Sequence, residues 1–212
     1  TGRICPAPCE SACVLGINNL PVAIEEVEKN IIEIAFEKGF AKPIIPQTRT
    51  GKKVAVVGSG PAGLASAYQL NQMGHSVVVF ERDPEIGGLL RFGIPDFKLD
   101  KKIIERRVEW MKQEGIEFKT NINVGVNYSV EDLDRNFDAV VLALGSTVPR
   151  DLMIPNRDAK GVHFAMDFLS QSNKKVSGIP FSEKDINAKG KKVVVIGGGD
   201  TGADCIGTSN RQ

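Results

Sequence analysis

The chain has 212 residues, of which 42% are hydrophobic and 25% are charged, and its formal net charge is +1. This composition is ordinary for a globular protein with one large domain or two modest ones. A net charge so close to zero gives no general attraction to nucleic acid or to a membrane surface. No apolar stretch is long enough to cross a bilayer, so the sequence predicts a cytoplasmic protein.

The first expected domain, residues 1–50, is a small helical element followed by a linker. Two early prolines favour loop, with at most a short helical turn, over residues 1–20. Apolar residues recur at helical spacing over residues 21–39. Pro21 suits the first position of this helix, and Gly39 suits its C-terminal cap.

An apolar run at 53–57 leads into a glycine-rich turn, and a helical pattern follows at 61–73. A second apolar run at 76–81 ends in the acid Glu81. Strand, turn, helix, strand and terminal acid together predict a dinucleotide-binding βαβ unit, and a tight turn that binds nothing is the alternative. The turn has the spacing G-x-G-x-x-G and consists of Gly58, Ser59, Gly60, Pro61, Ala62 and Gly63.

Each glycine has a physical task in such a unit. Gly58 permits the tight turn out of the strand, Gly60 lets a pyrophosphate approach the backbone, and Gly63 lets the helix pack close to the sheet. The helix that starts at Pro61 directs its free N–H groups at the phosphates. Glu81 can accept hydrogen bonds from both ribose hydroxyls, which favours FAD or NAD over NADP at this site.

Strands and helices alternate over the rest of the chain. This alternation predicts an α/β fold with a parallel sheet, helices on both faces, and ligands beyond the carboxyl ends of the strands. Residues 171–190 are expected to be mostly loop. We expect helices at 100–114, at 129–135 with a Ser129 cap and at 164–170, and strands at 116–120, 122–126, 138–144 and 192–196.

The glycine spacing recurs after the last expected strand, at residues 197–202. Two such motifs imply two nucleotide domains, at 51–156 and 157–212, of which the second would hold a nicotinamide nucleotide, and a turn that binds none is the alternative. The chain ends inside this unit, so we expect a truncated piece of a longer polypeptide. The residues that distinguish NADH from NADPH would lie about twenty positions further on. The candidate contacts are Gly197, Gly199, Asp200, Thr201 and Gly202, where Asp200 either caps the helix or faces the nicotinamide.

Residues 81–95 resemble the stretch after the second strand in two-dinucleotide flavoprotein reductases of the glutathione-reductase and adrenodoxin-reductase type. In that group a Gly-Gly pair brings the backbone near the flavin's phosphate and ribityl chain, which favours FAD at the first motif. An ordinary glycine-rich loop is the alternative. The resemblance implies further FAD contacts at Arg82, Gly88, Leu89, Arg91, Ile94, Val126, Ala143, Leu144 and Gly145.

Three of the four cysteines lie close together, at Cys5, Cys9 and Cys13. Thiolates at this density suit an iron–sulfur cluster, which needs four ligands, and packing on one helical face is the alternative. No cysteine lies between Cys13 and Cys205, which we expect to be a small core residue. The redox cysteine pair that disulfide reductases place beside the flavin is therefore missing from this chain.

Three stretches, at 3–28, 54–101 and 193–212, are together similar to the small (beta) subunits of bacterial NADPH-dependent glutamate synthases. The resemblance implies a Rossmann-like flavoprotein with two dinucleotide-binding domains and the remnant of an N-terminal helical iron–sulfur domain. It implies FAD at the first motif, NADPH at the second and two 4Fe–4S clusters. The implied ligands are Cys5 and Cys9 for one cluster, Cys13 for the other, and Glu28, which is otherwise a solvated helix residue.

The resemblance also implies a reaction and a partner. Electrons from NADPH would pass through FAD and the clusters to a glutamate synthase large (alpha) subunit, where glutamine and 2-oxoglutarate yield glutamate. One alternative is a reductase subunit of a pyrimidine- or ferredoxin-linked iron–sulfur oxidoreductase. The other is a nucleotide-binding module without catalysis.

Overall fold

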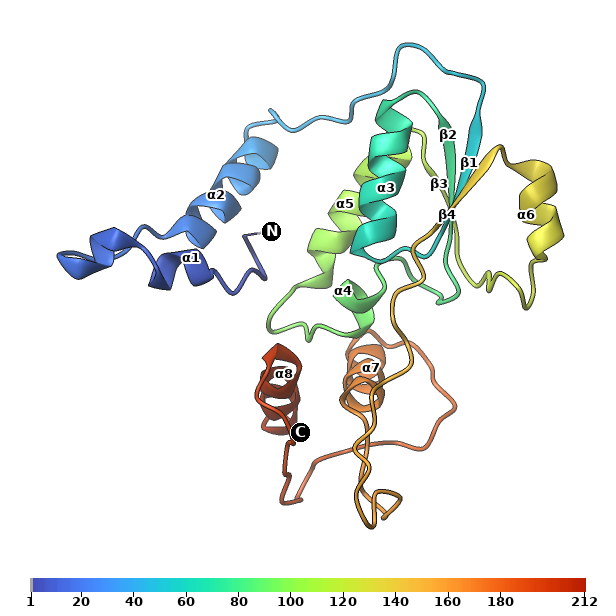
Figure 1. Cartoon of the computed structure of the whole chain (residues 1–212). Coiled ribbons are helices and arrows are strands. Elements are labelled where there is room, and N and C mark those ends of the chain that lie inside the picture. Colours follow the sequence, from blue (N-terminus) through green and yellow to red (C-terminus); the bar gives the residue numbers. More distant parts are fainter. Residues whose placement is uncertain (1) are drawn as a thin grey trace. The chain divides into compact units, whose positions relative to one another are not determined.

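The computed structural model describes residues 2–212, and contacts divide the chain into a unit that ends at Ile44 and a unit from Ile45 to Gln212 (Figure 1). The sequence predicted a boundary at residue 50, and the division by contacts falls a few residues before it. The further division at residue 156 stays a prediction. In the part of the chain that the structure describes, no helix is long and apolar enough to cross a membrane.

The first unit consists of short helices and loops, as its sequence predicts. Its longest helix begins at Ile24, so the expectation that Pro21 opens it is wrong. The start is determined from outside the helix, because the Glu10 carboxylate accepts a hydrogen bond from the Glu25 N–H at 2.8 Å and so satisfies a first-turn donor. Gly39 has φ +68° just after the helix, which confirms its place at the C-terminal cap. The elements are α1 (Pro8–Ser11), η1 (Val14–Ile17) and α2 (Ile24–Glu37).

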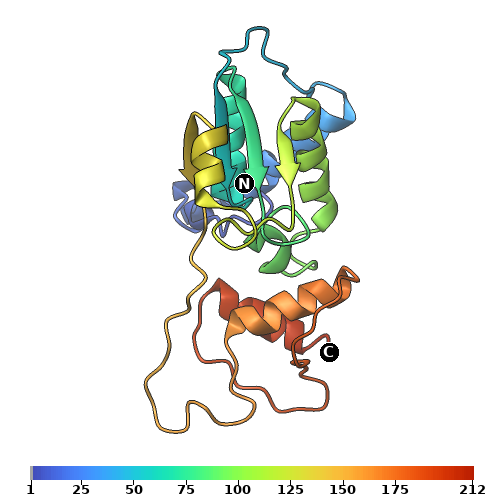
Figure 2. The ribbon, with the colours of Figure 1, turned by 90° about the vertical axis from the view of Figure 1, so that its right-hand side faces the viewer.

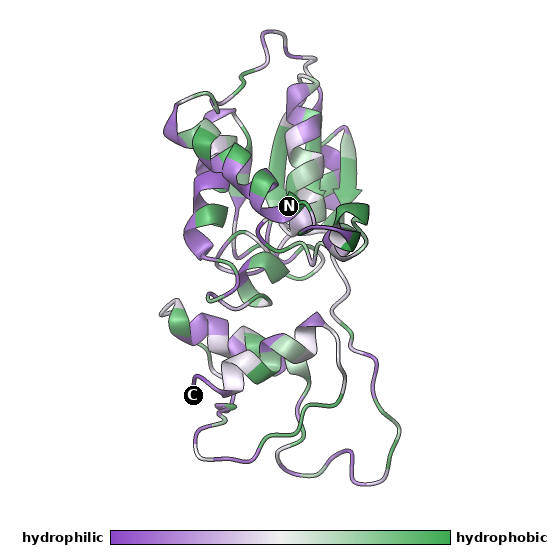
Figure 3. Cartoon of the chain, turned by 90° about the vertical axis from the view of Figure 1, so that its left-hand side faces the viewer, coloured by the Kyte–Doolittle hydropathy of each residue, from purple (hydrophilic) through white to green (hydrophobic). Residues whose placement is uncertain are grey.

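The second unit is built on a four-stranded sheet in the order β3-β2-β1-β4. Every neighbouring pair is parallel, which confirms the expected α/β class. The two central strands consist largely of buried valines, the composition that a parallel strand covered on both faces requires (Figure 3). The strands are β1 (Lys53–Val57), β2 (Ser76–Phe80), β3 (Glu117–Lys119) and β4 (Ala139–Leu142).

Helices cover both faces of this sheet (Figure 1; Figure 2). α3 (Pro61–Gln72) and α5 (Lys101–Gln113) lie on one face, and α6 (Val130–Asn136) lies on the other. On the α6 face the ring of Phe80 packs against Tyr128, with 5.0 Å between the ring centroids. These helices confirm the expected ones within a few residues. The Ser129 cap is also confirmed, because its hydroxyl accepts the Asp132 N–H at 3.0 Å.

The strand expected at 122–126 is not formed, apart from an isolated bridge between Val124 and Tyr128. Instead the side chain of Asn127 accepts the Asn123 N–H at 2.7 Å. Local bonds of this kind offer the backbone an alternative to a sheet ladder, so this stretch forms a turn.

The C-terminal part of the second unit contains α7 (Ala165–Val176) and α8 (Asp200–Ser209). α7 continues beyond residue 170, so the expectation of loop over its last turns is wrong. The two helices share a small core of Phe168, Leu169 and Cys205, which confirms Cys205 as a core residue.

The strand expected at 192–196 is absent from the described structure, and Val194 is 86% exposed. Its composition suits a buried parallel strand, but a strand needs a neighbour to pair with its backbone N–H and C=O groups. No strand of residues 2–212 pairs with this segment, so it has no sheet ladder.

Asn71 joins two helices on one face of the sheet and gives a test of the fold. Its side chain is fully buried, donates to the Glu114 carbonyl at 3.0 Å and accepts from Arg49 at 2.7 Å. We expect Asn71→Ala to lower the free energy of unfolding by about 2 kcal/mol, because both partners lose their bond. Urea denaturation measures this loss. Asn136→Ala is the control, since that exposed side chain bonds only within its own helix and should cost less than about 0.5 kcal/mol; equal losses would contradict the assignment.

Candidate functional site

The first glycine turn joins the carboxyl end of β1 to α3, and its glycines differ in what surrounds them. Gly58 has φ +105°, and a Cβ there would lie 2.3 Å from the Ala143 carbonyl oxygen. A Cβ at Gly63 would lie 1.9 Å from the Gly58 carbonyl oxygen. The tight turn and the close helix packing predicted for these two glycines are therefore confirmed.

Gly60 has no such neighbour, because a Cβ there would meet nothing within 4 Å. It is the N-cap of α3, and no side chain caps this helix end. Pro61 occupies a first-turn position and Ala62 beside it is exposed. The first-turn N–H groups thus face open space, where a helix end is suited to bind a phosphate group. The approach of a pyrophosphate to Gly60 stays a prediction that this geometry permits.

Glu81 directly follows β2 and is only 5% exposed, yet its carboxylate is well satisfied. One oxygen accepts from the backbone N–H of Ser59 at 3.0 Å and from the Ser59 hydroxyl. The other accepts from the Asp83 N–H at 2.9 Å. Because a carboxylate offers about four acceptor positions, roughly one remains for a ribose hydroxyl. Hydrogen bonds from both ribose hydroxyls to Glu81 stay a prediction.

Asp83 is a neighbour of Glu81 that sequence reasoning did not single out. Burial, and then the nearby charge of Glu81, raise the pKa of the Asp83 carboxyl above its usual value. Two acids close to one another in a partly buried edge of the sheet are costly, and such costs concentrate at functional sites.

The second glycine pair lies directly against the first turn. Gly88 has φ +52°, and a Cβ there would lie 2.9 Å from the Cα of Gly60. The Gly87 N–H donates to the Ser59 hydroxyl oxygen at 3.0 Å. α4 (Leu89–Phe92) begins immediately after this pair. The loop that the flavoprotein resemblance singled out therefore returns to the glycine turn, and it does so through backbone contacts that only glycine allows.

Arg91 is hydrogen-bonded to the loop that contains the second glycine pair. Its side chain is buried, its Nε donates to the Ile86 carbonyl at 2.9 Å, and its guanidinium lies 3.6 Å from Glu105 and 3.9 Å from Glu85. A contact between Arg91 and the flavin stays a prediction.

The remaining expected FAD contacts are spread along the same edge of the unit. Leu144 and Gly145 follow the end of β4, beside the glycine turn that contacts the Ala143 carbonyl. The side chains of Leu89, Leu144 and Val126 are exposed, as is that of Arg82, whereas Ile94 is half-buried. Their contacts with FAD stay predictions.

The second glycine motif repeats the geometry of the first. Gly197 has φ +117°, a Cβ at Gly202 would lie 2.7 Å from the Gly197 carbonyl oxygen, and a Cβ at Gly199 would meet nothing within 4 Å. Gly199 is the N-cap of α8, so the alternative in which Asp200 caps this helix is wrong. Asp200 and Thr201 are exposed in the first turn of α8. The second turn thus repeats the open helix end of the first, and binding of a nicotinamide nucleotide there stays a prediction.

The N-terminal cysteines have suitable chemistry but are not assembled. Backbone hydrogen bonds with Val22 and then Leu15 hold the pKa of the Cys13 thiol below its usual value, as suits a thiolate ligand. Cys5 and Cys9 are exposed. Within residues 2–212, no three side chains of His, Cys, Asp or Glu, Glu28 included, lie together so as to hold a metal ion. Cluster ligation by these residues stays a prediction.

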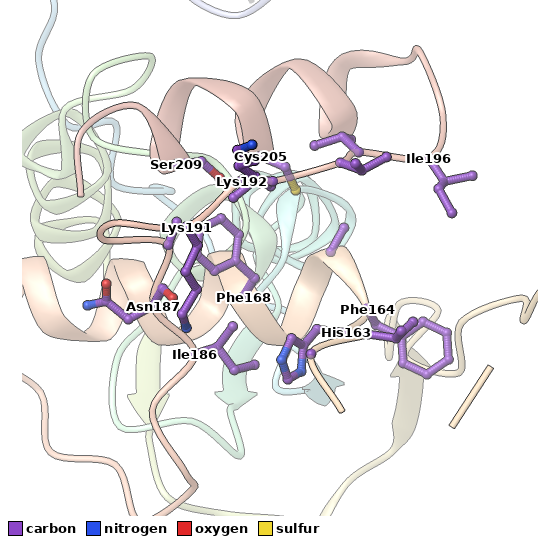
Figure 4. A pocket seen from close by; sticks show the side chains of 17 residues that line it. His163, Phe164, Phe168, Ile186, Asn187, Lys191, Lys192, Ile196, Cys205 and Ser209 are labelled. Carbon is purple, nitrogen blue, oxygen red and sulfur yellow. Dashed lines mark hydrogen bonds between the residues drawn. The ribbon is translucent and has the colours of Figure 1, made fainter. Parts of the chain in front are cut away.

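A cavity of about 490 Å³ lies among α7, α8 and the unpaired segment before the second motif (Figure 4). Its lining is mostly apolar and includes Phe168, Ile186 and Cys205. No glycine of either nucleotide motif lines it. It lies beside the second glycine turn without including it, because its lining extends to Ile196, the residue before Gly197.

The parallel sheet, the two glycine turns and the buried acid define a dinucleotide-binding α/β protein. The chain belongs to the pyridine nucleotide-disulphide oxidoreductase family, whose model matches residues 24–133 and 52–211.

Individual relatives are also similar over the whole chain. Glutamate synthase (NADPH) small chain of Bacillus subtilis is 56% identical over 213 residues, which are 100% of this chain and 43% of that protein. Glutamate synthase (NADH) of Schizosaccharomyces pombe is 58% identical over 215 residues, 100% of this chain and 10% of that protein. The chain thus spans less than half the length of these relatives. The solved structure of FprA from Mycobacterium tuberculosis in complex with NADPH has 30% identity and a TM-score of 0.53, covering 57% of this chain and 29% of that one.

Proposed function

We propose that the full-length protein is a flavoprotein subunit that takes electrons from NADPH onto FAD and delivers them to the large subunit of a glutamate synthase. The observation that carries the proposal is the first glycine turn, where an open Gly60 backbone, the buried Glu81 carboxylate and the Gly87–Gly88 pair meet at one edge of the sheet. The relative from Bacillus subtilis, named as the NADPH-linked small chain, supports the assignment of the reaction.

The residues at the first turn would hold the ADP half of FAD. The open first turn of α3 would face the pyrophosphate, Glu81 would accept from the ribose, and the Gly88 backbone would lie beside the ribityl chain. When bound, the flavin supplies the acceptor for a hydride from reduced nicotinamide. This chain needs no acid–base pair for that transfer, so its groups bind, orient and exclude water.

The second turn would hold the nicotinamide nucleotide. FprA, which is similar in sequence and fold, was solved with NADPH, and this supports nicotinamide-nucleotide binding by the protein. NADH is the second candidate coenzyme, because the relative from Schizosaccharomyces pombe carries NADH in its name at similar identity.

The proposal also includes the path of electrons from the flavin to the large subunit. Iron–sulfur clusters held in part by Cys5, Cys9 and Cys13 would connect the flavin to the partner, and the lowered pKa of Cys13 supports a ligand role for that thiol. Within residues 2–212 these cysteines do not lie together with other ligands as a metal-binding group. A cytoplasmic site of action belongs to the proposal as well.

Anaerobic titration of the purified full-length protein tests this function. We expect a yellow protein whose flavin absorbance is bleached completely by NADPH, and a parallel titration with NADH reveals the coenzyme preference. Addition of the large subunit, glutamine and 2-oxoglutarate should then give NADPH-dependent glutamate formation. A colourless protein that neither coenzyme reduces would instead indicate a nucleotide-binding module, and reduction without glutamate formation would indicate a different electron acceptor.

A further inference from the structure

Ser59 is the second residue of the first glycine turn, and it is fully buried. Its hydroxyl donates to the Glu81 carboxylate and accepts the Gly87 N–H at 3.0 Å. Its backbone N–H donates to the same Glu81 oxygen at 3.0 Å. One small side chain therefore connects the glycine turn to two positions, Glu81 and Gly87, that lie 22 and 28 residues further along the chain.

The arrangement requires a hydroxyl. A serine hydroxyl has one proton to donate and lone pairs to accept, so it can serve a carboxylate and an N–H at the same time. A methyl group in its place would leave the Gly87 N–H without its acceptor in a buried position, and it would remove one of the donors to Glu81.

These bonds also determine where the second glycine pair lies. Gly88 approaches the Cα of Gly60 so closely that a Cβ would lie 2.9 Å from it. The N–H of the preceding Gly87 is held by the Ser59 hydroxyl. Glu81, the acid proposed to bind the ribose, and Gly87, beside the proposed ribityl contact, are thus both hydrogen-bonded to the Ser59 hydroxyl.

We propose that the Ser59 hydroxyl is a positioning group that couples Glu81 to the Gly87–Gly88 pair and so assembles the FAD cradle before FAD arrives. This inference rests on the proposed function, since it requires FAD at the first turn. A preassembled site loses less conformational freedom on binding, so removal of the anchor weakens binding.

FAD titration into the FAD-free full-length protein, followed by flavin fluorescence, tests this role. We expect Ser59→Ala to raise the Kd for FAD about tenfold or more, because one buried donor and one buried acceptor are lost. Ser66→Ala is the matched control, since that hydroxyl lies on α3, the helix that follows the turn, and bonds to the Ala62 carbonyl at 2.9 Å. Its Kd should stay within about twofold of the wild-type value.

A double-mutant cycle separates coupling from a general loss of structure. In a Glu81→Gln background, Ser59→Ala should cost much less than in the wild type, because the charged partner is already gone. A purely structural role would give the same loss in both backgrounds and would overturn the inference.

The remaining outcomes are equally distinct. If the wild type takes up no FAD, the proposed function fails. If it binds FAD and Ser59→Ala binds as tightly as Ser66→Ala, the positioning role fails alone. Should Ser59→Ala show no cooperative unfolding, Ser59→Cys takes its place, with a raised Kd supporting the role and a wild-type Kd overturning it.

Discussion

Gly63→Ala is expected to lower the free energy of unfolding of the FAD-free protein by about 3 kcal/mol, because the added methyl group overpacks a contact with the backbone. The Cβ would lie 1.9 Å from the Gly58 carbonyl oxygen and 2.9 Å from its carbon, and both atoms belong to the backbone of the turn. Neither can move without separating α3 from the sheet. Chemical denaturation measures the loss.

The direction of the change is itself diagnostic. Alanine is favoured over glycine inside a helix by roughly 1 kcal/mol, so a position with free space would be stabilised by the same substitution. Gly60→Ala is the comparison without overpacking, because its Cβ meets nothing within 4 Å; it lies at the N-cap of α3, outside the helix interior, so no stabilisation by alanine is expected there. Unchanged or increased stability of Gly63→Ala would mean that α3 does not contact β1 as closely as the structure has it.

The two glycine turns could be predicted from the sequence because their requirements are local. Gly58 and Gly63 must lack side chains for reasons contained within a strand, a turn and a helix, and the spacing of three glycines records those reasons. The βαβ unit follows for the same reason. The strands are parallel, as expected, because a helix that connects two neighbouring strands returns the chain to the same end of the sheet.

Two of the failed predictions, the strand at 192–196 and the start of the long helix at Pro21, depend on neighbours that lie outside the sequence pattern itself. The valine run before the second motif has the composition of a strand, but no strand among residues 2–212 pairs with it. The start of α2 depends on Glu10, which no helical pattern over residues 21–39 contains. Composition shows what a segment can form, and the available neighbours decide whether it does.

The side chains of the site were also predictable only where their task is local. Glu81 was predicted because an acid at a strand end has a known task, whereas the Ser59 hydroxyl acts on partners 22 and 28 residues away. A serine between two glycines, where alanine would also satisfy the turn, is the one signal that could have revealed it. Arg91 has a support role that only its contacts reveal, since the sequence places it near the flavin without showing its direction.

Gly60→Ala is expected to raise the Kd for FAD on the order of a hundredfold, because charge-assisted bonds to a phosphate are each worth more than neutral ones. The residue has φ −64° and ψ 179°, an extended conformation open to any residue, so alanine introduces no backbone strain. Its Cβ would project into the open space in front of α3. That is the space through which we propose the pyrophosphate reaches the first-turn N–H groups.

Two measurements together test this second prediction. FAD titration should give the raised Kd, while denaturation of the FAD-free protein should lower the free energy of unfolding by no more than about 1 kcal/mol, the cost of alanine at an N-cap. Gly63→Ala should show the opposite pattern, with a large loss of stability before any cofactor is added. The two glycines lie three positions apart in one turn. If both variants changed the Kd for FAD and the free energy of unfolding in the same way, the different surroundings of Gly60 and Gly63 could not explain it. If Gly60→Ala binds FAD as the wild type does, the pyrophosphate does not lie against this backbone, and the open end of α3 has another use.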